Sequence, residues 1–120
     1  MPTIRQLTII TMDPERLARF YEDVFEMTRV ENPQKNAVYL TDGYMNLTLV
    51  PNRAEGKPSG LNHFGFVVEN EAETARRIEK WGLAQPRGKG GKRATSKDRA
   101  TDPDGNNFNI TADGYDVGPR

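Results

Sequence analysis

Residues 3–24 read TIRQLTIITMDPERLARFYEDV, and this stretch decides the fold. Its first part, residues 3–12, is rich in β-branched residues and predicts a strand. Asp13 can cap a helix and Pro14 fits a first helical position, so the strand runs directly into a helix. Apolar residues then recur every three to four positions, at Leu17, Phe20, Tyr21 and Val24. We therefore expect an amphipathic helix that packs by one side.

Three short strands are predicted after this helix, near residues 28–32, 37–41 and 45–50. Asp42-Gly43 is a turn signal between the last two. This gives a first β-α-β-β-β module over residues 1–52. Residues 53–60 hold a proline and two glycines and predict a linker.

The same order then begins again, because a shift of 57 residues places RQLTII (5–10) over NHFGFV (62–67). Asn70 and Glu73 have the capping-box spacing for a helix that runs to about Trp81 and stops at Gly82. Its apolar positions are Ala72, Ala75, Ile78 and Trp81. Strands near 83–86, 98–101 and 106–111, with a turn at 102–105, complete a second module over residues 61–115.

Composition limits the class of protein. A chain of 120 residues has room for one domain, and we expect residues 1–120 to form it. The 17 basic and 17 acidic side chains balance, so no net field favours nucleic acid or anionic lipid. The absence of cysteine and of an apolar leader or span makes a cytoplasmic, non-membrane protein the expectation.

Side-chain alternation gives each of the best strands one apolar and one polar face. The apolar faces should pack on the two helices. The polar face is neutral and rich in hydrogen-bonding groups, namely Gln6, Thr8, Asn46, Thr48, His63, Asn107 and Asn109. It is either the solvated side of a sheet or the inside of a ligand-binding cup, and Gly65 in mid-strand favours close approach by a ligand.

The chain resembles the vicinal oxygen chelate superfamily, which includes glyoxalase I, bleomycin-resistance proteins and extradiol dioxygenases. The resemblance rests on residues 4–21, on residues 60–68 and on Asp102-Pro103-Asp104-Gly105-Asn106 before the last strand. It implies an α+β fold in which two βαβββ modules form a curved mixed sheet with helices on its convex face. It also implies a small-molecule ligand and a homodimer.

Metal-using members of that superfamily usually hold one divalent ion with a His or Gln on the opening strand and a Glu on the closing strand of each half. The corresponding positions here are Gln6, Thr48, His63 and Asn109. Only Gln6 and His63 match, and both carboxylates are absent. Because Zn, Ni, Mn and Fe sites normally include anionic ligands, we expect no metal cofactor, with Gln6 and His63 as the ligands if there is one.

Residues 87–99, RGKGGKRATSKDR, form the single local concentration of positive charge. The stretch lacks the spacing of a phosphate-binding loop, so a solvated connector is the simpler interpretation. The alternative is a lid whose basic groups capture an anionic ligand, and Arg99 joins the ligand-binding candidates on that ground.

Three functions stay open. The first is metal-free binding or sequestration of a small, anionic or aromatic molecule, as in the bleomycin-resistance branch. The second is a metal-dependent lyase, isomerase or dioxygenase. The third is a metal-free enzyme in which His63 acts as the catalytic acid or base. The sequence does not identify the ligand, and whether the protein is an enzyme stays open.

Overall fold

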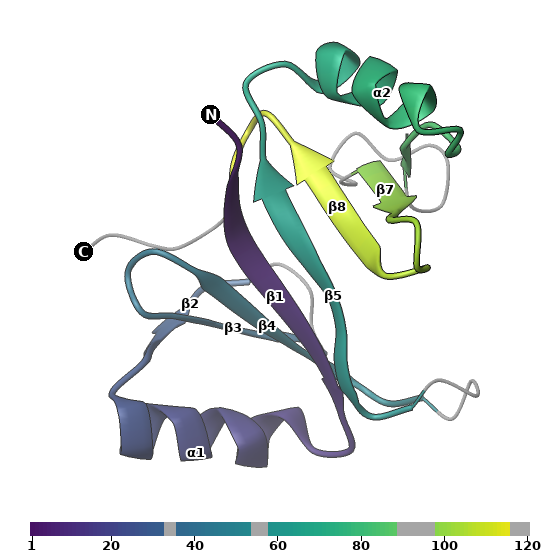
Figure 1. Ribbon diagram of the computed structural model, residues 1–120. Coiled ribbons are helices and arrows are strands. Elements are labelled where there is room, and N and C mark those ends of the chain that lie inside the picture. The colour runs from purple at the N-terminus through teal and green to yellow at the C-terminus, as the bar shows by residue number, and fades with distance from the viewer. Residues whose placement is uncertain (33–35, 54–57, 89–97, 116–120) are drawn as a thin grey trace. The chain divides into compact units, whose positions relative to one another are not determined.

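The computed structural model describes residues 1–32, 36–53, 58–88 and 98–115. They hold two helices and eight strands in the order β1 (Thr3–Thr11), α1 (Pro14–Phe25), β2 (Thr28–Val30), β3 (Val38–Thr41), β4 (Asn46–Pro51), β5 (Gly60–Val67), α2 (Glu71–Lys80), β6 (Arg87–Gly88), β7 (Asp98–Thr101) and β8 (Asn107–Thr111). Figure 1 shows these elements along the chain. The predicted βαβββ order is present twice, and the α+β class is confirmed.

The chain divides into two compact units. We call residues 6–62 with Tyr115 the N-terminal unit, and residues 63–114 with residues 1–5 the C-terminal unit. The first orders its strands β2-β3-β4-β1 and the second β5-β8-β7-β6. In each unit one neighbouring pair is parallel, β1 with β4 and β5 with β8, while the remaining pairs are antiparallel. The strand pairing within each unit is therefore mixed, as predicted.

The N-terminal unit packs its apolar sheet face against α1 (Figure 1). Asp13 caps this helix by accepting a hydrogen bond from the Arg16 backbone N–H, as its position before Pro14 predicts. The buried core is formed by Ala18, Leu40, Leu47 and Leu49, with Leu7, Ile9, Leu17, Tyr21, Met27 and Val38 packed against it. Phe20 and Val24, predicted on the buried face, are instead exposed by half or more. The buried face of the helix is narrower than the apolar pattern suggests.

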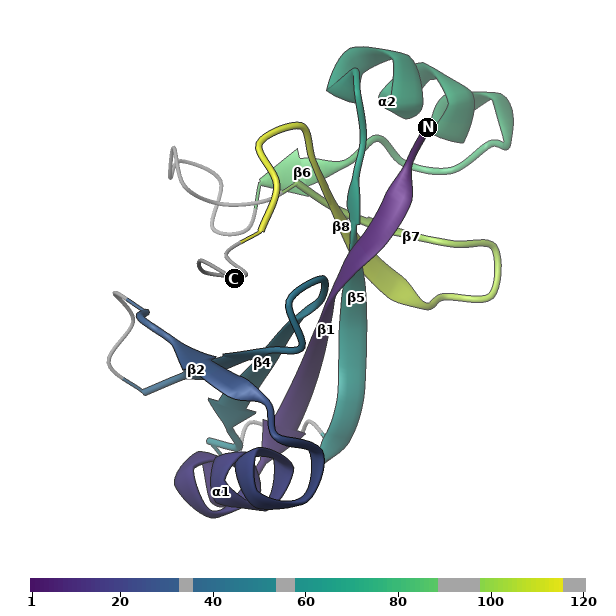
Figure 2. The same ribbon diagram turned by 90° about the vertical axis from the view of Figure 1, so that its left-hand side faces the viewer.

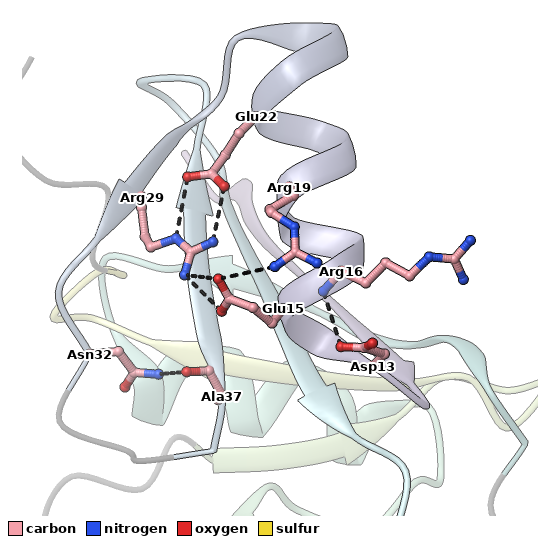
Figure 3. A network of polar contacts seen from close by, with 8 residues as sticks. All are labelled: Asp13, Glu15, Arg16, Arg19, Glu22, Arg29, Asn32 and Ala37. Carbon is pink, nitrogen blue, oxygen red and sulfur yellow. Dashed lines mark hydrogen bonds and ion pairs between the residues drawn. The ribbon is translucent and has the colours of Figure 1, made fainter.

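Arg29 joins α1 to strand β2 (Figure 3). Its guanidinium forms ion pairs of 2.9 Å with the carboxylates of Glu15 and of Glu22, both on α1. The hydrogen bond from Arg29 is the largest cause of the lowered pKa of Glu15, and the two carboxylates raise the pKa of Arg29. The short strand β2 is held to the helix by this network.

The C-terminal unit follows the same plan with a smaller helix. Asn70 accepts a hydrogen bond from the Glu73 backbone N–H, which confirms the predicted cap of α2. Phe64, Phe66 and Phe108 form an aromatic cluster on the apolar sheet face. Trp81, predicted on the apolar side of this helix, is 75% exposed, and the helix ends one residue before it, at Lys80.

The two predicted glycine turns are present, whereas one predicted edge strand is not. Gly43 and Gly105 adopt φ of +97° and +90°, which favours glycine at both predicted turns. The strand expected at residues 83–86 is wrong, since the pairing begins at Arg87. Pro86 has no backbone N–H for a sheet ladder, so the strand starts after it. Among the described residues no helix is long and apolar enough to cross a membrane.

Candidate functional site

Five polar residues of the N-terminal unit lie together on the sheet face opposite α1, and we call them the grid: Gln6, Thr8, Thr41, Asn46 and Thr48. Strand register places Gln6 beside Asn46 and Thr8 beside Thr48 on the parallel strands β1 and β4. On the antiparallel side, Thr48 pairs with Tyr39 and Asn46 with Thr41. Directly opposed residues point to the same side of a sheet, so the four predicted residues share one face.

This grid is buried, and only 5% of Gln6 is exposed. Thr8, Thr41, Asn46 and Thr48 are buried as well. The alternative that these residues form the solvated side of an ordinary sheet is therefore wrong for the N-terminal unit. Burying five polar side chains costs free energy unless they find partners, so their hydrogen bonds define what the face can do.

Hydrogen bonds link the grid into a chain that begins at the Gln6 amide. Gln6 Nε2 donates to Thr8 Oγ1 at 2.5 Å and to Thr48 Oγ1 at 3.1 Å. The Thr48 hydroxyl then donates to Asn46 Oδ1 at 2.5 Å. Gln6 Oε1 is buried, and no group among the described residues hydrogen-bonds to it. The network therefore ends at a buried acceptor whose hydrogen bond is not met by the described residues.

The C-terminal unit has an equivalent set of positions with different chemistry. Register places His63 beside Asn107 and Gly65 beside Asn109 on β5 and β8. Across the antiparallel pair β7–β8, Asn109 lies beside Arg99. The predicted residues of this unit are again brought to one sheet face. Asn109 is 8% exposed, whereas His63, Asn107 and Arg99 are partly buried.

Arg99 binds to both of the residues that occupy the family's ligand positions in this unit. Its Nε donates to Asn109 Oδ1 at 2.6 Å, and its Nη2 lies 3.4 Å from His63 Nε2. A guanidinium only donates hydrogen bonds, so a hydrogen bond at this contact needs His63 Nε2 as its acceptor. The sequence predicted Arg99 as a ligand group on charge alone and gave no sign of this contact.

The donor atoms on the two polar faces fit a divalent metal ion poorly. They are amide, hydroxyl and imidazole groups, with no carboxylate at the positions of Thr48 and Asn109. In the C-terminal unit the atoms that would face a metal, His63 Nε2 and Asn109 Oδ1, already face a cation. Within the described ranges, no group of three or more His, Asp or Glu side chains is arranged to hold a metal.

Two hollows lie away from these residues. One, of about 430 Å³, is lined by the start of α1 and the end of β1, including Asp13, Leu17 and Phe20. The other, of about 320 Å³, lies between α2 and the turn after β7, where Ile78, Trp81 and Phe108 line it. Neither contains a residue of the two polar faces. The rest of the predicted lid, residues 89–97, lies outside the described residues.

Comparison with known proteins agrees with the duplicated fold. Residues 6–111 match the family model described as a glyoxalase-like domain. The chain belongs to this family. No curated protein matches the glyoxalase-like chain.

Solved structures extend the comparison. The 2,3-dioxygenase LapB from Pseudomonas sp. KL28 is 18% identical with a TM-score of 0.74, covering 96% of this chain and 42% of that one. The Mn(II)-bound glyoxalase from Novosphingobium aromaticivorans is 17% identical with a TM-score of 0.73, covering 96% and 39%. A glyoxalase/bleomycin resistance protein/dioxygenase superfamily member from Vibrio splendidus 12B01 is 23% identical with a TM-score of 0.62, covering 90% and 97%.

These likenesses confirm the predicted superfamily and its fold. The glyoxalase-like chain spans about two fifths of the length of the dioxygenase and of the Mn(II)-bound glyoxalase. At these identities they do not transfer an activity. The function of this member has to be argued from its own side chains.

Proposed function

We propose that this glyoxalase-like domain binds a small molecule at its polar sheet residues without a metal ion, in the manner of a sequestering protein. The observation that carries the proposal is the position of Arg99. Its guanidinium contacts His63 Nε2 and Asn109 Oδ1, so the positive charge at this face comes from a side chain. A divalent ion beside that guanidinium would meet a repulsive charge and no compensating carboxylate.

The ligand-binding residues of the proposal are Gln6, Thr8, Asn46, Thr48, His63, Arg99, Asn107 and Asn109. Gln6 Oε1 supports a ligand that donates a hydrogen bond, because a buried acceptor without a partner costs about 1–3 kcal/mol. A ligand that satisfies this acceptor recovers part of that cost on binding. We also propose that the chain acts as a homodimer, which light scattering of the purified protein tests directly.

Metal content gives the first test. Purified protein is analysed for Zn, Ni, Mn and Fe, and each ion is then titrated into it by calorimetry. We expect no stoichiometric ion. The His63→Ala variant is the control, since it removes the single imidazole of the chain. Uptake of one ion per chain that disappears in this variant would overturn the proposal.

A second candidate, a metal-free enzyme, is favoured by the position of His63. Its imidazole is partly buried on the polar face beside Arg99, and a histidine side chain can act as a general acid or base. The test begins with a compound that raises the melting temperature in a thermal-shift screen. If wild type converts that compound and His63→Ala binds it equally well without turnover, the protein is an enzyme. If neither the wild type nor His63→Ala converts the compound, the sequestering function stands.

A further inference from the structure

Helix α1 exposes several large apolar side chains. Phe20, Val24 and Phe25 are 50%, 54% and 62% exposed, and Met12, just before the helix, is 77% exposed. Single apolar residues scattered over a surface are ordinary, whereas several gathered on one element mark an interaction surface. In Figure 2, α1 lies at the outside of the N-terminal unit, and no described element of this unit covers its outer side. These side chains are therefore accessible to a partner.

Helical spacing puts two opposite charges in line with Phe20. Arg16 precedes Phe20 by four residues and Asp23 follows it by three, so the three side chains lie along one strip of α1. Arg16 and Asp23 are exposed, and neither side chain forms an ion pair with another described residue. Figure 3 shows the Arg16 guanidinium pointing away from Glu15, whose carboxylate binds Arg29. The strip therefore offers one positive and one negative group to a partner.

The same strip has a hollow at one end and an exposed apolar side chain at the other. The hollow of about 430 Å³ lies at the start of α1, where Arg16, Leu17 and Phe20 are among the residues that line it. Val24 is exposed on the other side of Phe20. Arg16 and Val24 are each four residues from Phe20, or about 6 Å along the helix axis. A two-fold axis at Phe20 would therefore bring the Val24 end of one copy against the hollow of another.

We propose that this strip of α1 is the face by which two copies of the chain dimerise, with their α1 helices antiparallel across a two-fold axis at Phe20. Each Arg16 then faces Asp23 of the partner subunit, and Val24 of the partner subunit enters the hollow. A two-fold interface uses the same patch on both copies, so the two ion pairs form together. This inference rests on the homodimer put forward with the proposed function and names its contact surface.

The length of the helix sets the strength expected of this dimer. α1 has 12 residues and is about 18 Å long. One helix pair of this length buries less than the roughly 800 Å² per partner of a standard interface, which places the contact among transient interfaces. We therefore expect a dissociation constant on the order of micromolar, so that monomer and dimer exchange as the concentration changes.

The experiment is sedimentation velocity of the full chain over a range of concentrations, with charge reversal at the two ends of the strip. Arg16→Glu places two acidic groups opposite each other at both contacts, and Asp23→Arg places two basic groups there. Each variant should dimerise at least about tenfold more weakly than wild type. An equimolar mixture of the two variants should dimerise about as strongly as wild type, because both contacts across the axis then join opposite charges.

Arg19→Glu is the matched control. Arg19 is an exposed arginine of the same helix, but its guanidinium lies on the side that faces Glu15, outside the strip (Figure 3). The substitution makes the same change of charge and should leave dimerisation as it is in wild type. Circular dichroism spectra check that every variant is folded. The mixture is a second check, because a variant that fails to fold cannot restore the dimer.

Three outcomes overturn the inference. If wild type dimerises and neither charge reversal weakens the dimer, the interface lies elsewhere and the homodimer stands. If both folded variants are monomeric and their mixture stays monomeric too, Arg16 does not face Asp23 of the partner subunit. A wild-type chain that is monomeric at every concentration refutes the homodimer as well and leaves the strip to a partner other than a second copy. Metal-free ligand binding is decided separately by the metal analysis, so its failure and that of the dimer face are distinguishable.

Discussion

Replacing Gln6 by leucine should change the free energy of unfolding by no more than about 1 kcal/mol, although it removes a buried hydrogen-bonding residue. The substitution loses the two hydrogen bonds from Nε2 to Thr8 and Thr48. Neutral hydrogen bonds contribute about 1 kcal/mol each, so the loss is about 2 kcal/mol. It also removes the buried Oε1, whose missing partner costs about 1–3 kcal/mol. The lost hydrogen bonds and the removal of the unmet acceptor therefore nearly cancel in the free energy of unfolding.

Thr48→Val is the matched comparison on the neighbouring strand. It is close in volume, but it removes the acceptor of Gln6 Nε2 and the donor to Asn46 Oδ1 together. Unlike Gln6→Leu, it removes no buried atom that lacks a hydrogen-bond partner, so we expect the free energy of unfolding to fall by about 1–3 kcal/mol. Urea unfolding followed by circular dichroism measures both variants, with equal slopes as the check that the transition is comparable.

Ligand binding tests separately whether Gln6 Oε1 accepts a hydrogen bond from the ligand. If Oε1 receives the ligand, Gln6→Leu should bind any compound found by thermal shift about tenfold more weakly while keeping its stability. A loss of 3 kcal/mol or more in the unfolding of Gln6→Leu would refute the reasoning. It would mean that Oε1 is already well satisfied in the folded protein.

Three further changes test other parts of the structure. Leu40→Ala should lower the free energy of unfolding by about 2–5 kcal/mol, because Leu40 is 0% exposed in the core, and chemical denaturation measures this loss. Asp98→Asn should be more stable than wild type at neutral pH. The pKa of Asp98 is raised by burial and then by Glu71, so the folded wild type loses stability as pH rises through its titration range. Melting curves at pH 7 should show this gain, and it should vanish in acid below the ordinary pKa of aspartate, where both side chains are neutral. Arg29→Gln should lower the melting temperature, since it releases Glu22 and the helix from β2, and the loss should shrink in 1 M salt.

The sequence predicts most elements of this fold because their signals are local. The Asp13-Pro14 pair places the start of α1, and Asn70 places that of α2. Alternation along the strands correctly assigns Gln6 and His63 to polar faces. These features depend on neighbours a few residues away, so no knowledge of the tertiary structure is needed.

Features that depend on pairing across strands are not predictable in this way. The contact between Arg99 and His63 depends on the register of β7 with β8 and of β8 with β5. The pairing of Arg87 with Arg99 lies beyond the wrongly predicted strand at residues 83–86. Burial of the N-terminal grid is likewise a property of the packed molecule, and the alternation of side chains also allowed a solvated face.

The duplicated register explains why the two halves differ in charge while sharing a fold. Tyr39 beside Thr48 in the N-terminal unit holds the position that Arg99 beside Asn109 holds in the C-terminal unit. The first half therefore keeps a neutral network that ends in an acceptor, and the second carries a cation on equivalent strands. The residue at this register position, Tyr39 or Arg99, is one source of the difference in charge. Arg99→Tyr should thus make the second half resemble the first, with loss of this positive charge and no loss of the sheet in the circular dichroism spectrum.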